Sequence, residues 1–169
     1  MKTYGFTLVE VLIVIALIGI ILSIAVPNYN DTMKKAQIEK QTKELHSIIV
    51  TARLSAMQNK QPGAIFLGSN SYVYRVYTSL NYPISTGFKT IKTDSFPFVL
   101  FKNPSGTTIL NPLDVSTDNI TFDTRGFTNN DMTLVVTPLK YSGGDDCIVV
   151  HTSRTNVGRM ENASSCTTR

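Results

Sequence analysis

The first part of the chain is dominated by an unbroken apolar run that begins close to the N-terminus. From Phe6 to Val26 it reads FTLVEVLIVIALIGIILSIAV, 21 residues of which only Glu10 is charged. A helix of this length is about 30 Å long, enough to cross the hydrocarbon core of a bilayer. The pattern therefore predicts a transmembrane helix over residues 6–27.

The apolar run is followed by a charged stretch in which apolar positions recur at helical spacing. The positions that fall on one helical face are Ile38, Leu45, Ile49, Ala52 and Ala56. We expect residues 28–60 to continue the helix, with the later part packed against the chain's own domain. Gln61-Pro62-Gly63 should end it.

Beyond Gly63 the pattern changes to short β-like runs separated by turn residues. No ten-residue helical pattern recurs between these runs, so we expect antiparallel sheets. The expected strands are Ala64–Leu67, Tyr72–Thr78, Phe98–Lys102, Thr107–Leu110, Ile120–Asp123, Thr133–Thr137, Ile148–Thr152 and Val157–Glu161. The predicted fold class is α+β: a long N-terminal transmembrane helix packed on an antiparallel β-sheet head, residues 61–169.

Composition and motifs add little chemistry to this picture. The chain has 169 residues, 42% hydrophobic and 17% charged, and a net charge of +4 that is spread along it. Sequence patterns of a nucleophile elbow, a zinc protease, a P-loop and a dinucleotide-binding site are absent.

We interpret His46 and His151 as packed or solvated side chains. Asp145-Asp146 is read as a solvated turn, with calcium binding as the alternative. We expect no catalytic site, no metal and no cofactor.

Glu10 is the feature that an ordinary membrane segment leaves unexplained. A secretory signal cleaved at Ser23-Ile24-Ala25, giving a chain that starts at Val26, or a simple anchor would account for the apolar length. A carboxylate within the membrane costs roughly 2.5–3.5 kcal/mol, so it marks a partner or a function. Its counter-charge must come from the processed N-terminus of the chain or from another subunit.

The segment Gly5-Phe6-Thr7-Leu8-Val9-Glu10, with the apolar run behind it, closely resembles the processing site of type IV prepilins and type II secretion pseudopilins. The resemblance implies a leader over residues 1–5, cleaved by a prepilin peptidase between Gly5 and Phe6, with N-methylation of Phe6. It also implies that Glu10 pairs with the N-terminal amine of a neighbouring subunit during assembly. Pro27 matches a proline of the family and implies a kink in the helix.

Two stretches, one in the head and one on the predicted helix, resemble the minor pilins grouped as GspH/FimT. Ile120–Gly126 is similar to their F-x-x-x-G segment, and Thr51–Ala56 to their A-R-x-x-A stretch. The resemblance implies a structural minor subunit of a type IV pilus or a type II secretion system, and it leaves open which machine. It places the chain in the inner membrane as a single-pass protein with its head in the periplasm. A major pilin, a DNA-binding minor pilin and an anchored enzyme are the alternatives.

Cys147 and Cys166 lie near the C-terminus of a chain that we expect to be exported. A disulfide is therefore favoured over two free thiols, and it would contribute roughly 3 kcal/mol by closing a loop of about 20 residues.

Arg154 and Arg159 are the candidate DNA contacts at this end of the chain. Some FimT-type pilins bind DNA through a Gly-Arg-x-Arg element, and arginines there would contact phosphates. This chain has Gly158-Arg159-Met160-Glu161, with a carboxylate in place of the second arginine. DNA binding is therefore possible but not favoured.

Overall fold

A computed structural model describes residues 6–77, 88–103, 111–113, 118–128, 131–137, 144–162 and 165–168 of the chain, without the side chains of residues 24–28, 88, 103, 111, 112 and 162. Contacts divide the chain into two compact units, Met1–Lys34 and Lys35–Arg169. The predicted leader, residues 1–5, and the predicted strand Thr107–Leu110 lie outside the described residues.

A single helix, α1, runs from Leu8 to Asn59. Thr7 caps its start, because the Thr7 hydroxyl accepts a hydrogen bond from the backbone N–H of Glu10 at 3.3 Å. The backbone stays helical through Pro27, so the proline does not end the helix, and the kink there remains a prediction. After Asn59 the chain turns with Lys60 at a φ of 52°, and Pro62 follows.

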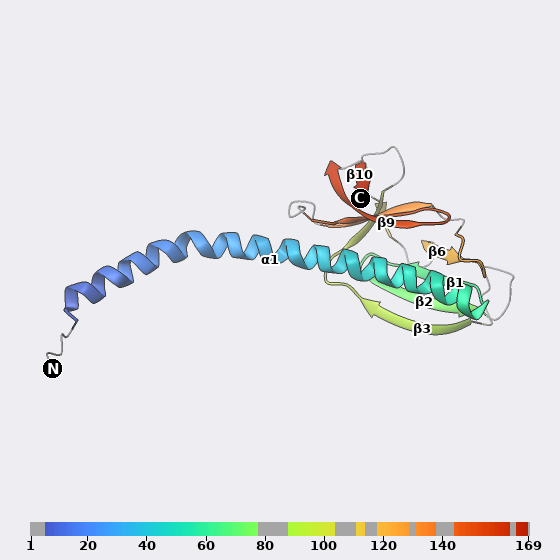
Figure 1. Ribbon diagram of the computed structural model, residues 1–169, viewed down its shortest axis with the longest axis horizontal. Coiled ribbons are helices and arrows are strands. Elements are labelled where there is room, and N and C mark those ends of the chain that lie inside the picture. The colour runs from blue at the N-terminus through green and yellow to red at the C-terminus, as the bar shows by residue number, and fades with distance from the viewer. Residues whose placement is uncertain are drawn as a thin grey trace. The chain divides into compact units, whose positions relative to one another are not determined.

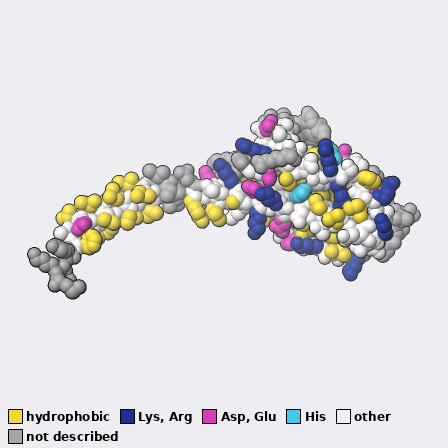
Figure 2. Space-filling model, viewed as in Figure 1, with side chains coloured by type: hydrophobic (Ala, Val, Ile, Leu, Met, Phe, Trp, Pro, Cys, Tyr) yellow, Lys and Arg dark blue, Asp and Glu magenta, His cyan; other side chains and the backbone are white. Residues whose placement is uncertain are grey.

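The first turns of α1 carry apolar side chains on every side, and Figure 2 shows them in yellow along the visible face. The exposed large apolar residues between positions 6 and 22 are Phe6, Leu8, Val9, Val11, Leu12, Ile13, Val14, Ile15, Leu17, Ile18, Ile20, Ile21 and Leu22. Because a helix turns by about 100° per residue, the consecutive positions from 11 to 15 cover its whole circumference. In the part of the chain that the structure describes, no helix is found that is both long enough and apolar enough to cross a membrane.

The rest of the second unit is built from two sheets, and every described strand pairing is antiparallel. The four-stranded sheet has the order β3-β2-β1-β6, and the six-stranded sheet has the order β10-β9-β8-β7-β4-β5. The strands are β1 Gly63–Leu67, β2 Ser71–Tyr77, β3 Phe88–Ser95, β4 Leu100–Asn103, β5 Asn111–Pro112, β6 Asn119–Phe122, β7 Met132–Val136, β8 Cys147–Val150, β9 Thr155–Asn162 and β10 Ser165–Thr168. The α+β class with antiparallel sheets is therefore confirmed.

The later part of α1 lies across β1 and β2 and supplies one wall of the hydrophobic core (Figure 1). All five residues of the predicted helical face are buried, each at most 2% exposed. They pack in one cluster with Ile65 and Ile120 of the four-stranded sheet and with Leu134 and Ile148 of the six-stranded sheet. The helix therefore gives both sheets a shared core.

Buried polar side chains tie irregular segments to this core. Gln41 on α1 donates to the carbonyl of Phe98 at 2.8 Å and accepts from its N–H at 2.9 Å. Asp146 is 1% exposed and accepts a hydrogen bond from the backbone N–H of Met160 at 2.7 Å. Asp145 is also buried. The interpretation of Asp145-Asp146 as a solvated turn was therefore wrong, because at least one of the carboxylates is engaged with β9.

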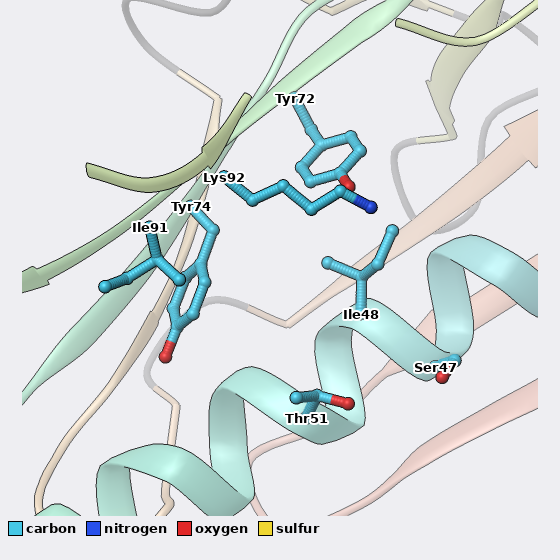
Figure 3. A pocket seen from close by; sticks show the side chains of 7 residues that line it. All are labelled: Ser47, Ile48, Thr51, Tyr72, Tyr74, Ile91 and Lys92. Carbon is cyan, nitrogen blue, oxygen red and sulfur yellow. The ribbon is translucent and has the colours of Figure 1, made fainter. Parts of the chain in front are cut away.

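A cavity of about 270 Å³ lies between α1 and the β2–β3 pair, as Figure 3 shows. The residues that line it are Ser47, Ile48, Thr51, Tyr72, Tyr74, Ile91 and Lys92. Three come from the helix, two from β2 and two from β3, so the cavity exists only because the helix and the edge of the sheet are packed together.

Candidate functional site

The N-terminal end of α1 holds the residues that the sequence singled out for processing and assembly. Gly5 lies outside the described residues, whereas Phe6 is described and is 79% exposed just before the helix. Glu10 is in the first helical turn and is exposed. Its carboxylate has no ion-pair partner among the residues that the structure describes.

The position of Glu10 follows from how the helix begins. Thr7-Leu8-Val9-Glu10 has the spacing of a capping box, with the threonine as N-cap and the glutamate three residues later. A carboxylate in the first turn also interacts favourably with the positive end of the helix dipole. The local sequence thus places Glu10 in the first turn of the helix. Its carboxylate lies among exposed apolar side chains and is accessible to a cation from outside the chain.

The two stretches that resemble GspH/FimT pilins meet each other. Phe122 is 1% exposed in the core, and the guanidinium of Arg53 on α1 lies 5.4 Å from the centroid of its ring. Arg53 also donates to the carbonyls of Ser153 at 2.6 Å and His151 at 3.2 Å. Burial lowers the pKa of Arg53. This arginine therefore joins the helix to the β6 strand end and to the turn that follows β8.

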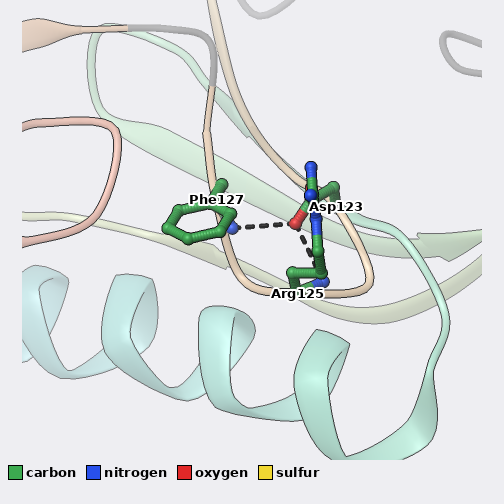
Figure 4. A network of polar contacts seen from close by, with 3 residues as sticks. All are labelled: Asp123, Arg125 and Phe127. Carbon is green, nitrogen blue, oxygen red and sulfur yellow. Dashed lines mark hydrogen bonds and ion pairs between the residues drawn. The ribbon is translucent and has the colours of Figure 1, made fainter.

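The turn after β6 is organised by Asp123, as Figure 4 shows. Its carboxylate accepts hydrogen bonds from the backbone N–H groups of Arg125 at 2.8 Å and Phe127 at 2.9 Å. The Arg125 side chain adds an ion pair at 3.0 Å. Partial burial acts to raise the pKa of Asp123, but these hydrogen bonds and the arginine outweigh it and hold the pKa below its usual value.

Gly126 allows this turn to approach the helix. Its φ is +82°, in the left-handed region that favours glycine. A Cβ at this position would lie 2.8 Å from Cγ and Sδ of Met57 and 3.1 Å from Cγ of Arg53. The glycine of the F-x-x-x-G segment is therefore required both by backbone conformation and by close packing.

The C-terminal strands are joined by the disulfide between Cys147 and Cys166 that the sequence predicted. Cys147 is on β8 and Cys166 on β10, with β9 between them in the sheet. A Cβ at Gly158 of β9 would clash first with the backbone carbonyl of Thr167 on β10 and would lie 3.0 Å from Sγ of Cys166. Glycine at this position therefore leaves room both for the backbone of β10 and for the disulfide.

Arg154 and Arg159 are both exposed near this end of the chain. Arg154 lies in the turn between β8 and β9, and Arg159 lies on β9. Glu161 follows Arg159 by two residues on β9, and both are exposed. The carboxylate therefore weakens the positive field in which a phosphate would bind.

The histidines make structural contacts. His46 is hydrogen-bonded through Nε2 to the carbonyl of Thr155 at 3.1 Å, which ties α1 to β9. His151 lies 3.9 Å from a carboxylate oxygen of Asp131. Within the described part of the chain, no group of three or more His, Cys, Asp or Glu side chains is placed to hold a metal ion.

Residues 1–26 match the family described as the prokaryotic N-terminal methylation motif. The chain is 40% identical over 83 residues to the fimbrial protein EcpB of Eikenella corrodens, covering 41% of this chain and 52% of that protein. It is 33% identical over 64 residues to the type IV major fimbrial protein FimA of Dichelobacter nodosus, covering 38% and 41%. The chain thus spans about half the length, or less, of these curated relatives.

Among solved structures, the chain is similar to the minor pseudopilin EpsH from the type II secretion system of Vibrio cholerae, with 11% identity and a TM-score of 0.47. The similarity covers 73% of this chain and 94% of EpsH.

Proposed function

We propose that this chain, whose methylation motif and fimbrial relatives support the type IV pilin and pseudopilin superfamily, is a non-enzymatic structural subunit of a type IV pilus or a type II secretion pseudopilus. The observation that carries the proposal is the single carboxylate of Glu10 in a helix surface that is otherwise apolar and exposed. Such a surface is suited to packing against other helices or lipid, and the carboxylate selects a partner that carries a positive charge.

The proposed sequence of events begins in the inner membrane, where residues 6–27 form the anchor and the head lies in the periplasm. A prepilin peptidase removes residues 1–5 and methylates the new amine on Phe6. The amine of one subunit then pairs with Glu10 of its neighbour. In surroundings of low dielectric constant such a pair is much stronger than in water, and it offsets the cost of burying either charge alone.

A minor subunit is the finer assignment that we favour. It rests on the pairing of Phe122 and Gly126 with the Arg53 region of α1, which brings together the two stretches that resemble GspH/FimT pilins. The similarity to the major fimbrial protein FimA supports a major subunit as the second candidate. Quantifying the chain in sheared filaments distinguishes these roles, because a major subunit would be the bulk component.

Processing is tested by intact-mass analysis of the mature protein purified from its host. The proposal expects a chain that begins at an N-methylated Phe6. A chain that begins at Val26 would identify an ordinary secretory signal and would refute the proposal.

Assembly is tested by replacing Glu10 with glutamine, which keeps the size of the side chain and removes its charge. We expect Glu10→Gln to be processed normally but to fail to enter filaments, with Glu10→Asp restoring part of the incorporation. Glu44→Gln is the matched control, because Glu44 is an exposed glutamate on the same helix. Incorporation of Glu10→Gln at the level of the control would refute the role of the charge.

Binding of DNA through Arg154 and Arg159 is the other candidate, favoured only by the exposure of both side chains. It predicts salt-sensitive gel shifts by the full chain that weaken in the Arg154→Gln/Arg159→Gln variant. We expect no shift at micromolar protein.

A further inference from the structure

The cavity between α1 and the β2–β3 edge has a mostly apolar wall. Ile48 approaches from the helix, while the rings of Tyr72 and Tyr74 form the side made by β2 (Figure 3). Tyr72 is fully buried, and Tyr74 is 7% exposed. Ser47 and Thr51 of the helix and Ile91 of β3 are exposed and form the opening. At about 270 Å³ the cavity is near the lower end of the range for ligand sites, so it suits a small molecule.

A β-bulge shapes the β3 side of this cavity. Tyr74 pairs with Lys92 and Arg75 pairs with Thr90, so Ile91 is an extra residue on β3. In a regular strand Ile91 and Lys92 would point to opposite faces of the sheet, yet both line the cavity. The bulge therefore places an apolar side chain and a cation side by side at one opening, and bulges of this kind commonly re-aim side chains next to functional sites.

Two tyrosine hydroxyls are the buried polar groups at the wall of this cavity. The hydroxyls of Tyr72 and Tyr74 are both buried; that of Tyr74 has no hydrogen-bond partner among the described residues, and that of Tyr72 has only the Lys92 ammonium beside it. Because a buried hydroxyl without a full set of partners is unfavourable, both groups favour a ligand or water that can hydrogen-bond to them.

Lys92 supplies the charge at this site. Its ammonium lies beside the Tyr72 hydroxyl, and this interaction, with a smaller contribution from Asp94, raises the pKa of Lys92. The ion pair with Asp94 is exposed and spans 3.5 Å, so it holds the ammonium only weakly. The cation therefore remains available to an anion that enters between Ile48 and the tyrosine rings.

We propose that this cavity binds a small molecule that joins an apolar body to a carboxylate. The body would lie against Ile48, Ile91 and the tyrosine rings, with the carboxylate at Lys92 and the Tyr72 hydroxyl. The assignment is independent of filament assembly, because none of these residues lies in the N-terminal unit.

The test uses the full chain in nonionic detergent, with empty micelles as the blank and 4-fluorophenylacetate as the probe, followed by fluorine NMR. We expect saturable binding, weakened about tenfold or more by Lys92→Gln, because a charge-assisted hydrogen bond is lost. The neutral amide of the probe should be weakened by a similar factor. Lys89→Gln removes a lysine of the same strand outside the cavity and should bind like the parent chain.

A second variant tests the site without touching its charge. Ile91→Trp adds bulk at an exposed position of the opening and should abolish binding while the far-ultraviolet circular dichroism and the urea midpoint of unfolding stay those of the parent chain. Absence of saturable binding to the parent chain up to about 10 mM probe would show that the cavity holds water only. Equal binding to the parent and to Lys92→Gln would refute the assigned position of the carboxylate.

Discussion

Replacing Gly126 with alanine tests how the turn after β6 is fitted to the helix. Alanine in the left-handed region costs roughly 1–2 kcal/mol, and the lower entropy of its unfolded chain returns about 0.4–1 kcal/mol. The new Cβ would lie 2.8 Å from Met57, whose flexible side chain is able to yield, and 3.1 Å from Arg53. Arg53 yields less, because its guanidinium is held by two backbone carbonyls. Overpacking typically costs about 1–3 kcal/mol, and we take a steric cost of about 1 kcal/mol here. Together with the backbone strain, we expect Gly126→Ala to lower the free energy of unfolding by about 2 kcal/mol.

The measurement is urea unfolding of the full chain in nonionic detergent, followed by near-ultraviolet circular dichroism. A loss of about 2 kcal/mol should lower the urea midpoint by about 1 M. In a Met57→Ala background only the Met57 share of the steric cost disappears, so Gly126→Ala should cost less there, between about 1 and 2 kcal/mol. A change of less than about 0.5 kcal/mol in the parent background would refute the reasoning, and an equal cost in both backgrounds would refute the role of Met57.

Three further predictions use the same unfolding measurement. Replacing Cys147 and Cys166 together with serine should lower the free energy of unfolding by about 3 kcal/mol, and a loss below about 1 kcal/mol would contradict the loop-closure argument. Because the folded pKa of Asp123 is depressed, its carboxylate stabilises the fold above the unfolded pKa near 3.8 and loses this effect as the pH falls further. The deficit of Asp123→Asn should therefore be largest near neutral pH and vanish in acid; a pH-independent deficit would contradict this. Gln41→Leu removes both hydrogen bonds to Phe98 and should cost about 2 kcal/mol, and a cost below about 0.5 kcal/mol would contradict a structural role for these bonds.

The features that the sequence predicted well are those with a strong local pattern. The apolar face from Ile38 to Ala56 repeats at helical spacing, and every one of its five residues is buried. Cys147 and Cys166 are the only cysteines of the chain, so a disulfide within it could join only these two residues. In both cases the chemistry of the residues themselves restricts the outcome, and distant parts of the chain have little influence on it.

The strand β3 was not predicted from the sequence because its residues have the pattern of an edge strand. Phe88–Ser95 reads FKTIKTDS, with lysine or threonine at four of its 8 positions and no regular alternation of apolar residues. Lysines on an edge strand discourage pairing with other chains. The same lysines make the strand polar, so it lacks the hydrophobic periodicity by which strands are recognised in a sequence. The bulge at Ile91 breaks the period further, and it is this irregularity that creates the charged side of the cavity.

The buried polar residues escaped prediction for a different reason. Gln41 and Asp146 are satisfied by the backbone of Phe98 and Met160, 57 and 14 residues away in the sequence. A polar residue is read as solvated unless its partner is known, and here each partner is fixed only by the tertiary fold. The same applies to Arg53, which the sequence singled out by resemblance but whose carbonyl partners come from a turn about 100 residues later.

The N-terminal end of α1 exposes apolar side chains and a carboxylate that the described residues of its own unit neither cover nor neutralise. Thirteen large apolar side chains between Phe6 and Leu22 are each at least 46% exposed. Burying what remains exposed would be worth on the order of 10 kcal/mol, comparable with the whole stability of an ordinary domain. A surface of this kind is satisfied by lipid or by other helices, and lipid alone would leave Glu10 without a counter-charge. A neighbouring helix that ends in a free amine meets both needs at once, and this is why the carboxylate, rather than the apolar length, supports assembly as the proposed function.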